Sequence, residues 1–256
     1  MNNDRFLVID CNTLDPATTA WKPRSIFDIF KDGFALAEAD GVNQIEDWVC
    51  CRIACGEKLP TDIRSYKAIL ISGSHYCIRD NIEWFDELAG VIREANKNGS
   101  PKIFAGCFGC QIVAHALDGV VDKNQSGLFV LKAENITVNE DGSAILGVSN
   151  ANPLNIIVSH GDSVHQLPSG AKTLASSPSC TNELFICGDK DNILCCQSHP
   201  EFDYEYCIRE RIWKAVVDTK NRLSEEQKVE SMSSFEKYDG GDALILLKAI
   251  QMFIRR

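Results

Sequence analysis

A cysteine between small residues is the first candidate for chemistry in this sequence. The residues are Ala105-Gly106-Cys107-Phe108-Gly109, with an apolar run before them and a helical pattern after them. Small neighbours permit the strained strand-to-helix turn that presents a nucleophile at the carboxyl end of a strand. The N-terminus of the following helix would favour the Cys107 thiolate, and the Phe108 N–H would be free to stabilise an oxyanion. The pattern also fits a tight turn around a buried cysteine, so the chemical interpretation needs a partner residue.

A histidine with a carboxylate two residues later supplies that partner. His199-Pro200-Glu201 follows an apolar run, so His199 is also predicted to lie at the end of a strand. His199 could take the thiol proton and return it to a leaving amine. Glu201 could accept from the other ring nitrogen and fix the tautomer. We therefore predict a cysteine-dependent amide hydrolase with Cys107 as nucleophile, His199 as base and Glu201 as the residue that orients the base.

Short apolar runs alternate with helical patterns along the first half of the chain. Between two of these runs, apolar residues recur at helical spacing over 84–95. Strands that alternate with helices indicate right-handed βαβ units, and nearly continuous apolar strands indicate a sheet buried on both faces. We predict an α/β fold: an open, mostly parallel central sheet flanked by helices, with a nucleophile elbow. The first four predicted strands span 6–10, 48–53, 68–72 and 102–105.

Strand patterns dominate the second half of the chain. Residues 189–192 (DKDN) are typical of a hairpin turn, and the polar segment 220–241 is predicted to be a surface connection. No internal repeat or linker is visible, so we predict one domain over 1–256 with a C-terminal helical extension at about 220–256. The predicted strands are 127–138, 155–159, 172–175, 183–187 and 193–197, and the predicted helices are 109–117, 203–219 and 242–254.

Four motifs together resemble the class I glutamine amidotransferases. Members of that family typically carry Gly-x-Cys-x-Gly-His-Gln and, much later, His-Pro-Glu. The corresponding segments here are 105–111 (AGCFGCQ) and 199–201 (HPE); 69–74 (ILISGS) resembles the family's glycine-rich oxyanion turn, and 159–164 (SHGDSV) its substrate loop. The resemblance implies an open α/β fold and a triad of Cys107, His199 and Glu201. It also implies substrate contacts from Gly73, Ser74, Phe108, Gln111, Ser159 and His160.

Residues 66–256 are further similar to free-standing proteins like the plant γ-glutamyl peptidases. These combine an ISGS-type turn, a Cys-Phe-Gly elbow and an extra C-terminal helix, and the resemblance implies hydrolysis of γ-glutamyl amide bonds. Ala105 departs from the family's first elbow glycine but still fits a tight turn. Cys110 stands where a histidine outside the triad is usual, so the change should affect packing. In the family, an acidic residue often follows the glycine that corresponds to Gly127. Here Leu128 and Phe129 follow that glycine, which predicts a different pocket wall.

The leaving-group side of the substrate is expected to meet aromatic side chains. We predict that His75, Tyr76 and Phe129 form this wall. An aromatic wall would accept a peptide or a thioether conjugate through apolar contact, whereas an ammonia donor has less need of one. No P-loop, Gly-x-Gly-x-x-Gly or synthetase region is visible. We therefore expect γ-glutamyl peptides to be preferred to free glutamine, although the leaving group itself is not specified by the sequence.

Composition restricts the partners and the compartment. The formal net charge is −10, which should repel nucleic acid and anionic membranes. No apolar run reaches the roughly 18–20 residues that span a bilayer, and residues 1–9 are too short for a secretory signal and are predicted to begin the first strand. Several of the 12 cysteines lie in apolar runs, as buried free thiols do. A cytoplasmic protein with reduced cysteines is expected, without a cofactor or a metal.

Three functional classes remain open at this point. The first is the γ-glutamyl hydrolase with a small-molecule γ-glutamyl substrate. The second is a glutaminase subunit that delivers ammonia to a separate synthetase partner. The third is a non-catalytic or redox-sensing relative, because Cys107 and Cys110 also form a C-x-x-C pattern. A zinc site on the same pair would lack a second C-x-x-C or a closely spaced histidine pair.

Overall fold

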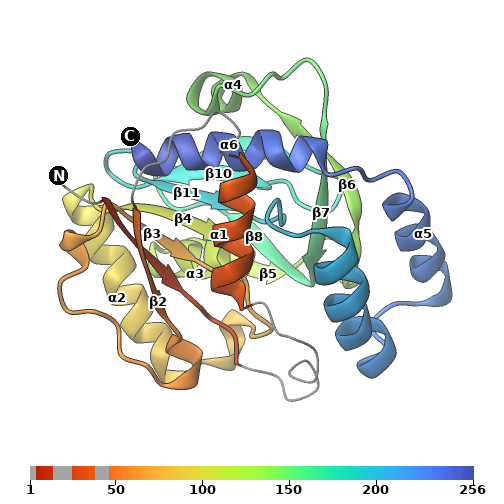
Figure 1. Ribbon diagram of the computed structural model, residues 1–256, viewed down its shortest axis with the longest axis horizontal. Coiled ribbons are helices and arrows are strands. Elements are labelled where there is room, and N and C mark those ends of the chain that lie inside the picture. The colour runs from red at the N-terminus through yellow and green to blue at the C-terminus, as the bar shows by residue number, and fades with distance from the viewer. Residues whose placement is uncertain (1–3, 14–24, 38–45) are drawn as a thin grey trace.

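A long mixed sheet organises the protein in the computed structural model, which describes residues 4–13, 25–37 and 46–256 (Figure 1). Within these residues nine strands form one sheet in the order β2-β1-β3-β4-β11-β10-β9-β6-β7, and β5 pairs with β8 separately. Residues 1–3 of the N-terminal segment 1–9 lie outside the described residues. The strands are β1 Asp4–Ile9, β2 Glu46–Cys51, β3 Ala68–Ile71, β4 Lys102–Gly106, β5 Val120–Lys123, β6 Val130–Val138, β7 Leu154–His160, β8 Asp162–Gln166, β9 Lys172–Ser176, β10 Leu184–Cys187 and β11 Ile193–Cys196.

In the part of the sheet with the order β2-β1-β3-β4-β11, each strand is parallel to the next. Their side chains alternate between two separate apolar cores. On β3, for example, Leu70 belongs to one core and Ile69 and Ile71 to the other, and all three are fully buried. A strand buried on both faces needs apolar residues at every position, which explains the continuous apolar runs. The predicted α/β class with an open, largely parallel sheet is confirmed.

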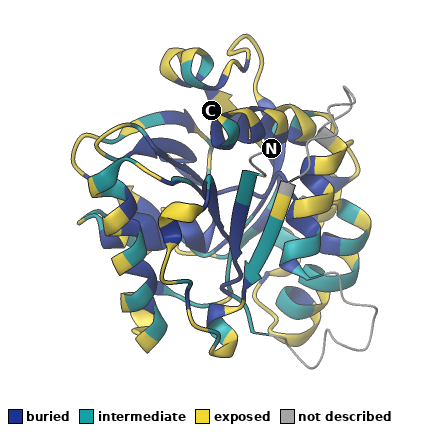
Figure 2. Cartoon of the chain, turned by 60° about the vertical axis from the view of Figure 1, so that its left-hand side comes forward, coloured by how far each residue is buried: buried dark blue, intermediate teal, exposed yellow. Residues whose placement is uncertain are grey.

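Helices cover both faces of this sheet (Figures 1 and 2). One core contains apolar residues of α1 (Ile26–Ala37) and α6 (Gly241–Arg255), which also pack against each other. The other core contains those of α2 (Glu83–Asn98) and α3 (Phe108–Ala116). Figure 2 shows buried strands at the centre and exposed residues on the outer surfaces of the helices. The fold is therefore three-layered around its parallel part.

The far half of the sheet is antiparallel. β11 pairs with β10, β10 with β9, β9 with β6, and β6 with β7, each in antiparallel register. The predicted hairpin turn between the last two strands is confirmed, since Ile193 pairs with Cys187 and the Asp191 N–H donates to the Gly188 carbonyl at 3.0 Å. Gly188 and Asp191 both have positive φ, which glycine and aspartate tolerate in tight turns.

The polar segment 220–241 was predicted to be a surface connection within a C-terminal helical extension. It contains α5 (Glu225–Phe235), which packs against β6. A capping box begins this helix: the Gln227 N–H donates to the Ser224 hydroxyl at 3.2 Å, and the Ser224 N–H donates to the Gln227 side chain at 3.0 Å. Helix α1 went unpredicted although Ser25 and Asp28 form a similar reciprocal pair. The capping signal Ser-x-x-Gln or Ser-x-x-Asp was available in both segments.

Two further helical regions complete the fold. The predicted helix 203–219 is present as two π-helical segments, η4 (Tyr204–Ile212) and η5 (Lys214–Thr219). The short helix α4 (Glu140–Leu146) was not predicted and is capped by Asn139, whose side chain accepts from the Gly142 N–H at 2.8 Å. None of the helices among the described residues combines the length and the apolar character needed to cross a membrane.

Candidate active site

Cys107 occupies a strained junction between β4 and α3. Its φ of 49° and ψ of −110° lie outside the regions that residues with a side chain ordinarily adopt. The Cys107 N–H donates to the Cys196 carbonyl at 2.7 Å, so the junction is held by the neighbouring strand β11. Gly109 lets α3 approach the sheet, since a Cβ there would lie 2.6 Å from the Ile71 carbonyl oxygen. The predicted nucleophile elbow is thus present, with Cys107 at the start of a helix.

His199 and Glu201 lie just beyond β11, next to the elbow. The His199 N–H donates to the Ile157 carbonyl at 2.8 Å, and His199 Nδ1 lies 2.8 Å from Glu201 Oε1. The Phe202 ring stacks on the imidazole with centroids 4.0 Å apart and an interplanar angle of 3°. His199 and Glu201 are 4% and 8% exposed. A backbone hydrogen bond, the Glu201 carboxylate and the stacked Phe202 ring therefore hold the imidazole in one orientation, as a positioned base requires.

The electrostatics favour a protonated His199. Burial alone would lower its pKa, but the charges of Glu201 and the Cys107 thiolate, with hydrogen bonds to both side chains, raise the pKa of His199 to about 10. In the resting site His199 therefore holds a proton that a leaving amine could take.

The glycine turn predicted to hold an oxyanion packs directly on the Cys107–His199 pair. A Cβ on Gly73 would lie 3.4 Å from Cys107 Cβ and 3.1 Å from His199 Cε1, so a side chain there would press on both residues. The Asn12 amide fixes the turn by donating to the Gly73 carbonyl at 2.7 Å, and the Ser74 hydroxyl donates to the Cys11 carbonyl at 2.6 Å. The predicted residues Gly73 and Ser74 are thus beside the elbow.

The other predicted substrate residues lie beside the sulfur or behind it. Cys107 Sγ is 3.7 Å from the Ser159 carbonyl oxygen. The Gln111 amide is buried and donates to the Asp162 carbonyl at 3.0 Å and to Gln197 Oε1 at 3.2 Å. His160 is also buried, and Phe108 contributes the first N–H of α3, which has no partner within the helix. All six line one cavity, but Gln111 and His160 are engaged in internal hydrogen bonds.

His160 differs sharply from His199 in its charge. Its Nε2 lies 3.2 Å from the Ser179 hydroxyl, which donates to the buried carboxylate of Glu134. Burial and the positive charge of His199 lower the pKa of His160 to about 4. His160 is therefore neutral at neutral pH and shapes the cavity wall behind Ser159 without adding charge.

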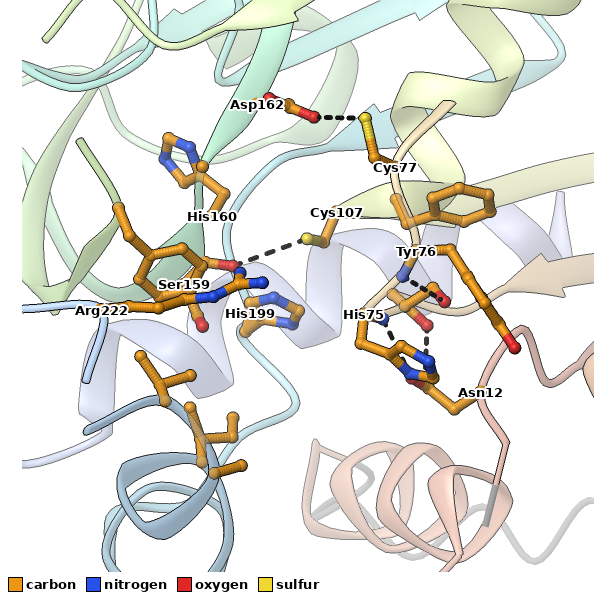
Figure 3. A pocket seen from close by; sticks show the side chains of 18 of the residues that line it. Asn12, His75, Tyr76, Cys77, Cys107, Ser159, His160, Asp162, His199 and Arg222 are labelled. Carbon is orange, nitrogen blue, oxygen red and sulfur yellow. Dashed lines mark hydrogen bonds between the residues drawn. The ribbon is translucent and has the colours of Figure 1, made fainter. Parts of the chain in front are cut away.

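The site opens into a cavity of about 760 Å³ (Figure 3). His75, Tyr76 and Phe129, predicted to meet the leaving group, all line it. Figure 3 shows Cys107 between the Asp162–Cys77 pair on one side and His199 and Arg222 on the other. Cys77 Sγ lies 2.9 Å from Asp162 Oδ2, and Asp162 also pairs with Arg79. Pockets of this volume typically bind ligands considerably larger than ammonia.

Several residues of the site were not found by sequence reasoning. Phe202 directly follows the His199-Pro200-Glu201 motif, and Asn12 follows the first predicted strand. Asn12 could have been found because a polar residue just past the end of a strand often lies in a binding site. Glu134 is buried in a strand, where a carboxylate breaks the apolar alternation and signals a partner. Arg222 carried no local signal. It lies more than 100 residues from the elbow and reaches the cavity only through the packing of η5.

The second cysteine of the C-x-x-C pattern is far from solvent. Cys110 is fully buried in α3, with Sγ 3.6 Å from Gln197 Oε1. Burial raises the pKa of the Cys110 thiol well above its ordinary value. All twelve cysteines lie in the described residues and are free thiols; nine are buried, Cys50 and Cys77 are half-buried, and Cys55 is exposed. Among the described residues, no three His, Cys, Asp or Glu side chains are grouped closely enough to hold a metal ion.

Comparison with known proteins identifies the family. Residues 55–206 match the profile of the glutamine amidotransferase class-I family, and the chain belongs to that family. The chain is 32% identical to γ-glutamyl peptidase 4 of Arabidopsis thaliana over 162 residues. The aligned residues make up 62% of this chain and 63% of the relative. A GMP synthase of Flavobacterium psychrophilum is 26% identical over 153 residues, 60% of this chain and 28% of the enzyme. The matched parts are thus less than two thirds of these relatives.

The fold comparison agrees over the whole chain. A crystal structure of a glutamine amidotransferase from Thermotoga maritima has a TM-score of 0.74 with this protein, covers 100% of both chains and is 16% identical in sequence. At 16% sequence identity this similarity shows a shared fold, built on the open α/β sheet described above, and not a shared function.

Substitution of Cys107 by alanine should abolish amidase activity. Alanine keeps the Cβ and hence the backbone conformation, so the melting temperature should fall by no more than about 4 °C. Activity on a γ-glutamyl amide and thermal unfolding should be measured on the same preparation. Turnover at the wild-type rate by a folded Cys107→Ala protein would contradict the assignment.

Substitution Glu201→Gln should lower the pKa of His199, because it removes the negative charge that favours imidazolium. We expect kcat to fall on the order of 10- to 10³-fold. NMR titration of the His199 ring in the two proteins measures the pKa directly. An unchanged pKa together with unchanged kcat would place Glu201 outside the mechanism.

The same substitution should have a pH-dependent effect on stability. The His199 pKa of about 10 in the folded protein exceeds its ordinary value of about 6.5. Protonation of His199 therefore stabilises the fold fully below about pH 6.5, and this contribution declines as the pH rises and is lost above about 10. Urea unfolding should show the largest destabilisation by Glu201→Gln near pH 6 and the smallest near pH 10; a difference independent of pH would contradict this coupling.

Cys110→Ser should retain most of the activity, since its thiol is buried and the hydroxyl can still donate to Gln197. Activity after mild oxidation, with mass spectrometry of the Cys107–Cys110 peptide, tests the point. Loss of activity in the variant, or a reversible disulfide that controls the wild type, would favour the redox alternative.

Proposed function

We propose that the protein is a cysteine-dependent hydrolase of γ-glutamyl amide bonds, with Cys107, His199 and Glu201 as its catalytic residues. The observation that carries the proposal is the position of Cys107. It lies on a strained elbow, beside a buried His199–Glu201 pair, in the wall of the 760 Å³ cavity. Membership of the glutamine amidotransferase class-I family supports γ-glutamyl chemistry, and the similarity to a γ-glutamyl peptidase supports a stand-alone hydrolase.

The first half of the reaction forms a thioester. The Cys107 thiolate attacks the γ-carbonyl carbon, a C–S bond forms, and the carbonyl electrons move to oxygen. The N–H of Phe108 and N–H groups of the turn at Gly73 and Ser74 stabilise this oxyanion. When the intermediate collapses, the C–N bond breaks and the leaving nitrogen takes the proton of the His199 imidazolium.

The second half restores the enzyme. Neutral His199 takes a proton from water as the water oxygen attacks the thioester carbon, and collapse then breaks the C–S bond. Glutamate and the Cys107 thiolate are released, and His199 is again protonated. Glu201 holds the ring through Nδ1 in both steps, which leaves Nε2 to carry the proton. The net reaction consumes one water and yields glutamate and an amine.

The dimensions of the cavity support a substrate with a substantial leaving group. Its wall includes the aromatic residues His75, Tyr76 and Phe129 as well as the apolar Ile212 and Val216. Apolar and aromatic surface contributes to binding only if the ligand reaches it, and ammonia does not. A γ-glutamyl peptide or conjugate would fill space that glutamine leaves to water.

The alternative is a glutaminase that supplies ammonia to a synthetase partner. The similarity to the GMP synthase of Flavobacterium psychrophilum favours it, since that enzyme's name states that it hydrolyses glutamine. The same three side chains would serve this reaction, so the cavity wall and not the triad distinguishes the two functions.

Kinetics on two substrates separate these functions. We expect a higher kcat/KM for a γ-glutamyl dipeptide than for glutamine, because the dipeptide also contacts the aromatic wall. Both substrates should be measured with the purified chain, with Cys107→Ala as the control for contaminating activity. Preference for glutamine, with turnover raised further by a synthetase, would replace the peptidase proposal.

A further inference from the structure

The cavity is positively charged although the chain is acidic overall. The formal net charge of the chain is −10. Among the residues that the structure describes, two carboxylates line the cavity, those of Asp162 and Glu201, whereas five cationic side chains do. The five are Arg79, Lys123, Arg211, Lys220 and Arg222. A positively charged cavity in a negatively charged protein indicates that its ligand is negatively charged.

Both carboxylates of the wall are already engaged. Asp162 pairs with Arg79 at 2.9 Å, and Glu201 pairs with His199 at 2.8 Å. Within the described parts of the chain, neither Lys220 nor Arg222 forms an ion pair with a carboxylate. Their charges are therefore available to a ligand, and Arg222 is the better placed of the two.

Arg222 is held in place by its own backbone. The preceding Asn221 adopts a φ of 44°, and the Arg222 N–H donates to the Val216 carbonyl at 2.9 Å. The following residue, Leu223, is buried in the core. The guanidinium carbon lies 5.4 Å from the centre of the Phe129 ring, which supports the side chain from one side. Figure 3 shows the side chain extending toward Ser159 and His199.

The position of Arg222 relative to His199 determines which part of a substrate it meets. The leaving nitrogen must lie beside His199, because it receives the imidazolium proton. In an α-amino acid the carboxylate carbon is only about 2.5 Å from the nitrogen, given standard bond lengths and angles. A cation on the His199 side of Cys107 is therefore within reach of a carboxylate on the leaving amino acid. The family resemblance assigns Gln111 to substrate binding, and its buried amide donates to the Asp162 carbonyl.

We infer that Arg222 forms a carboxylate subsite for the leaving group, so that the preferred substrates are γ-glutamyl amino acids or short peptides that end in a free carboxylate. This inference rests on the proposed function. Arginine suits the task because its planar guanidinium binds a carboxylate through two parallel hydrogen bonds. Neutral γ-glutamyl amides, which share the glutamyl end, lack the group that Arg222 binds.

Two substrates that differ only in the carboxylate test the inference. γ-Glutamylglycine and γ-glutamylglycinamide should be compared with the wild type, Arg222→Gln and Arg222→Lys. We expect the wild type to prefer γ-glutamylglycine, and Arg222→Gln to reduce that preference about 5- to 30-fold. Most of the change should be in KM, because the carboxylate is bound equally in the ground and transition states. Arg222→Lys should retain part of the preference, and added salt should weaken it.

Arg64→Gln is the matched control. Arg64 is an exposed arginine paired with Glu94 outside the cavity, so its loss should leave the substrate preference unchanged. Equal losses on both substrates in Arg222→Gln would overturn the inference, because Arg222 would then hold the glutamyl end. An unchanged preference would overturn it as well. Absence of turnover of either substrate by the wild type would instead reject the proposed function, and the inference with it.

Discussion

The parallel pairing of β4 with β11 is the constraint on which the candidate site depends. Ala105 and Gly106 pair with Cys195 and Cys196, and the next N–H, that of Cys107, continues the ladder to the Cys196 carbonyl. The same ladder therefore aligns the end of β4, where the elbow begins, with the end of β11, where the histidine motif begins. A shift of register by one residue would turn every side chain of a strand to the other face and separate the two motifs.

This ladder also sustains the unfavourable backbone of Cys107. A residue with a side chain in such a conformation costs on the order of 1–3 kcal/mol, which the surrounding structure must offset. The close approach of α3 at Gly109 and of the turn at Gly73 surrounds the elbow on both sides. The stability of the sheet thus keeps the buried Cys107 at the wall of the cavity, with the N–H groups at the start of α3 next to it.

Buried charge is the second constraint on the site. Burial of His199 and Glu201 is costly, and their mutual attraction at 2.8 Å offsets the loss of solvation. A second imidazole lies near the first, and repulsion would result if both were charged. Burial and the charge of His199 keep His160 neutral, and its Nε2 lies 3.2 Å from the Ser179 hydroxyl, which donates to Glu134. Two histidines in one site thus differ in charge because their partners differ.

The sequence alone identified the residues of the candidate site and the parallel part of the fold. Cys107, His199 and Glu201 were found because elbow glycines, strand ends and the His-Pro-Glu motif are local patterns, and buried parallel strands require continuous apolar runs. The Asp189–Asn192 turn was found for the same reason. Helix α1 was missed although its apolar residues Ile26, Ile29, Phe30 and Phe34 recur at helical spacing and its serine cap was visible.

Only the tertiary structure decided what surrounds the sulfur. Arg222 reaches the cavity because η5 ends in a left-handed turn and packs beside Phe129, a contact between residues 93 positions apart. The burial of Cys110, the commitment of Gln111 to internal hydrogen bonds and the neutral state of His160 likewise depend on distant partners. Local residue patterns specify backbone conformation and reactive groups, but charge, burial and the shape of a cavity arise from contacts that the order of residues does not display.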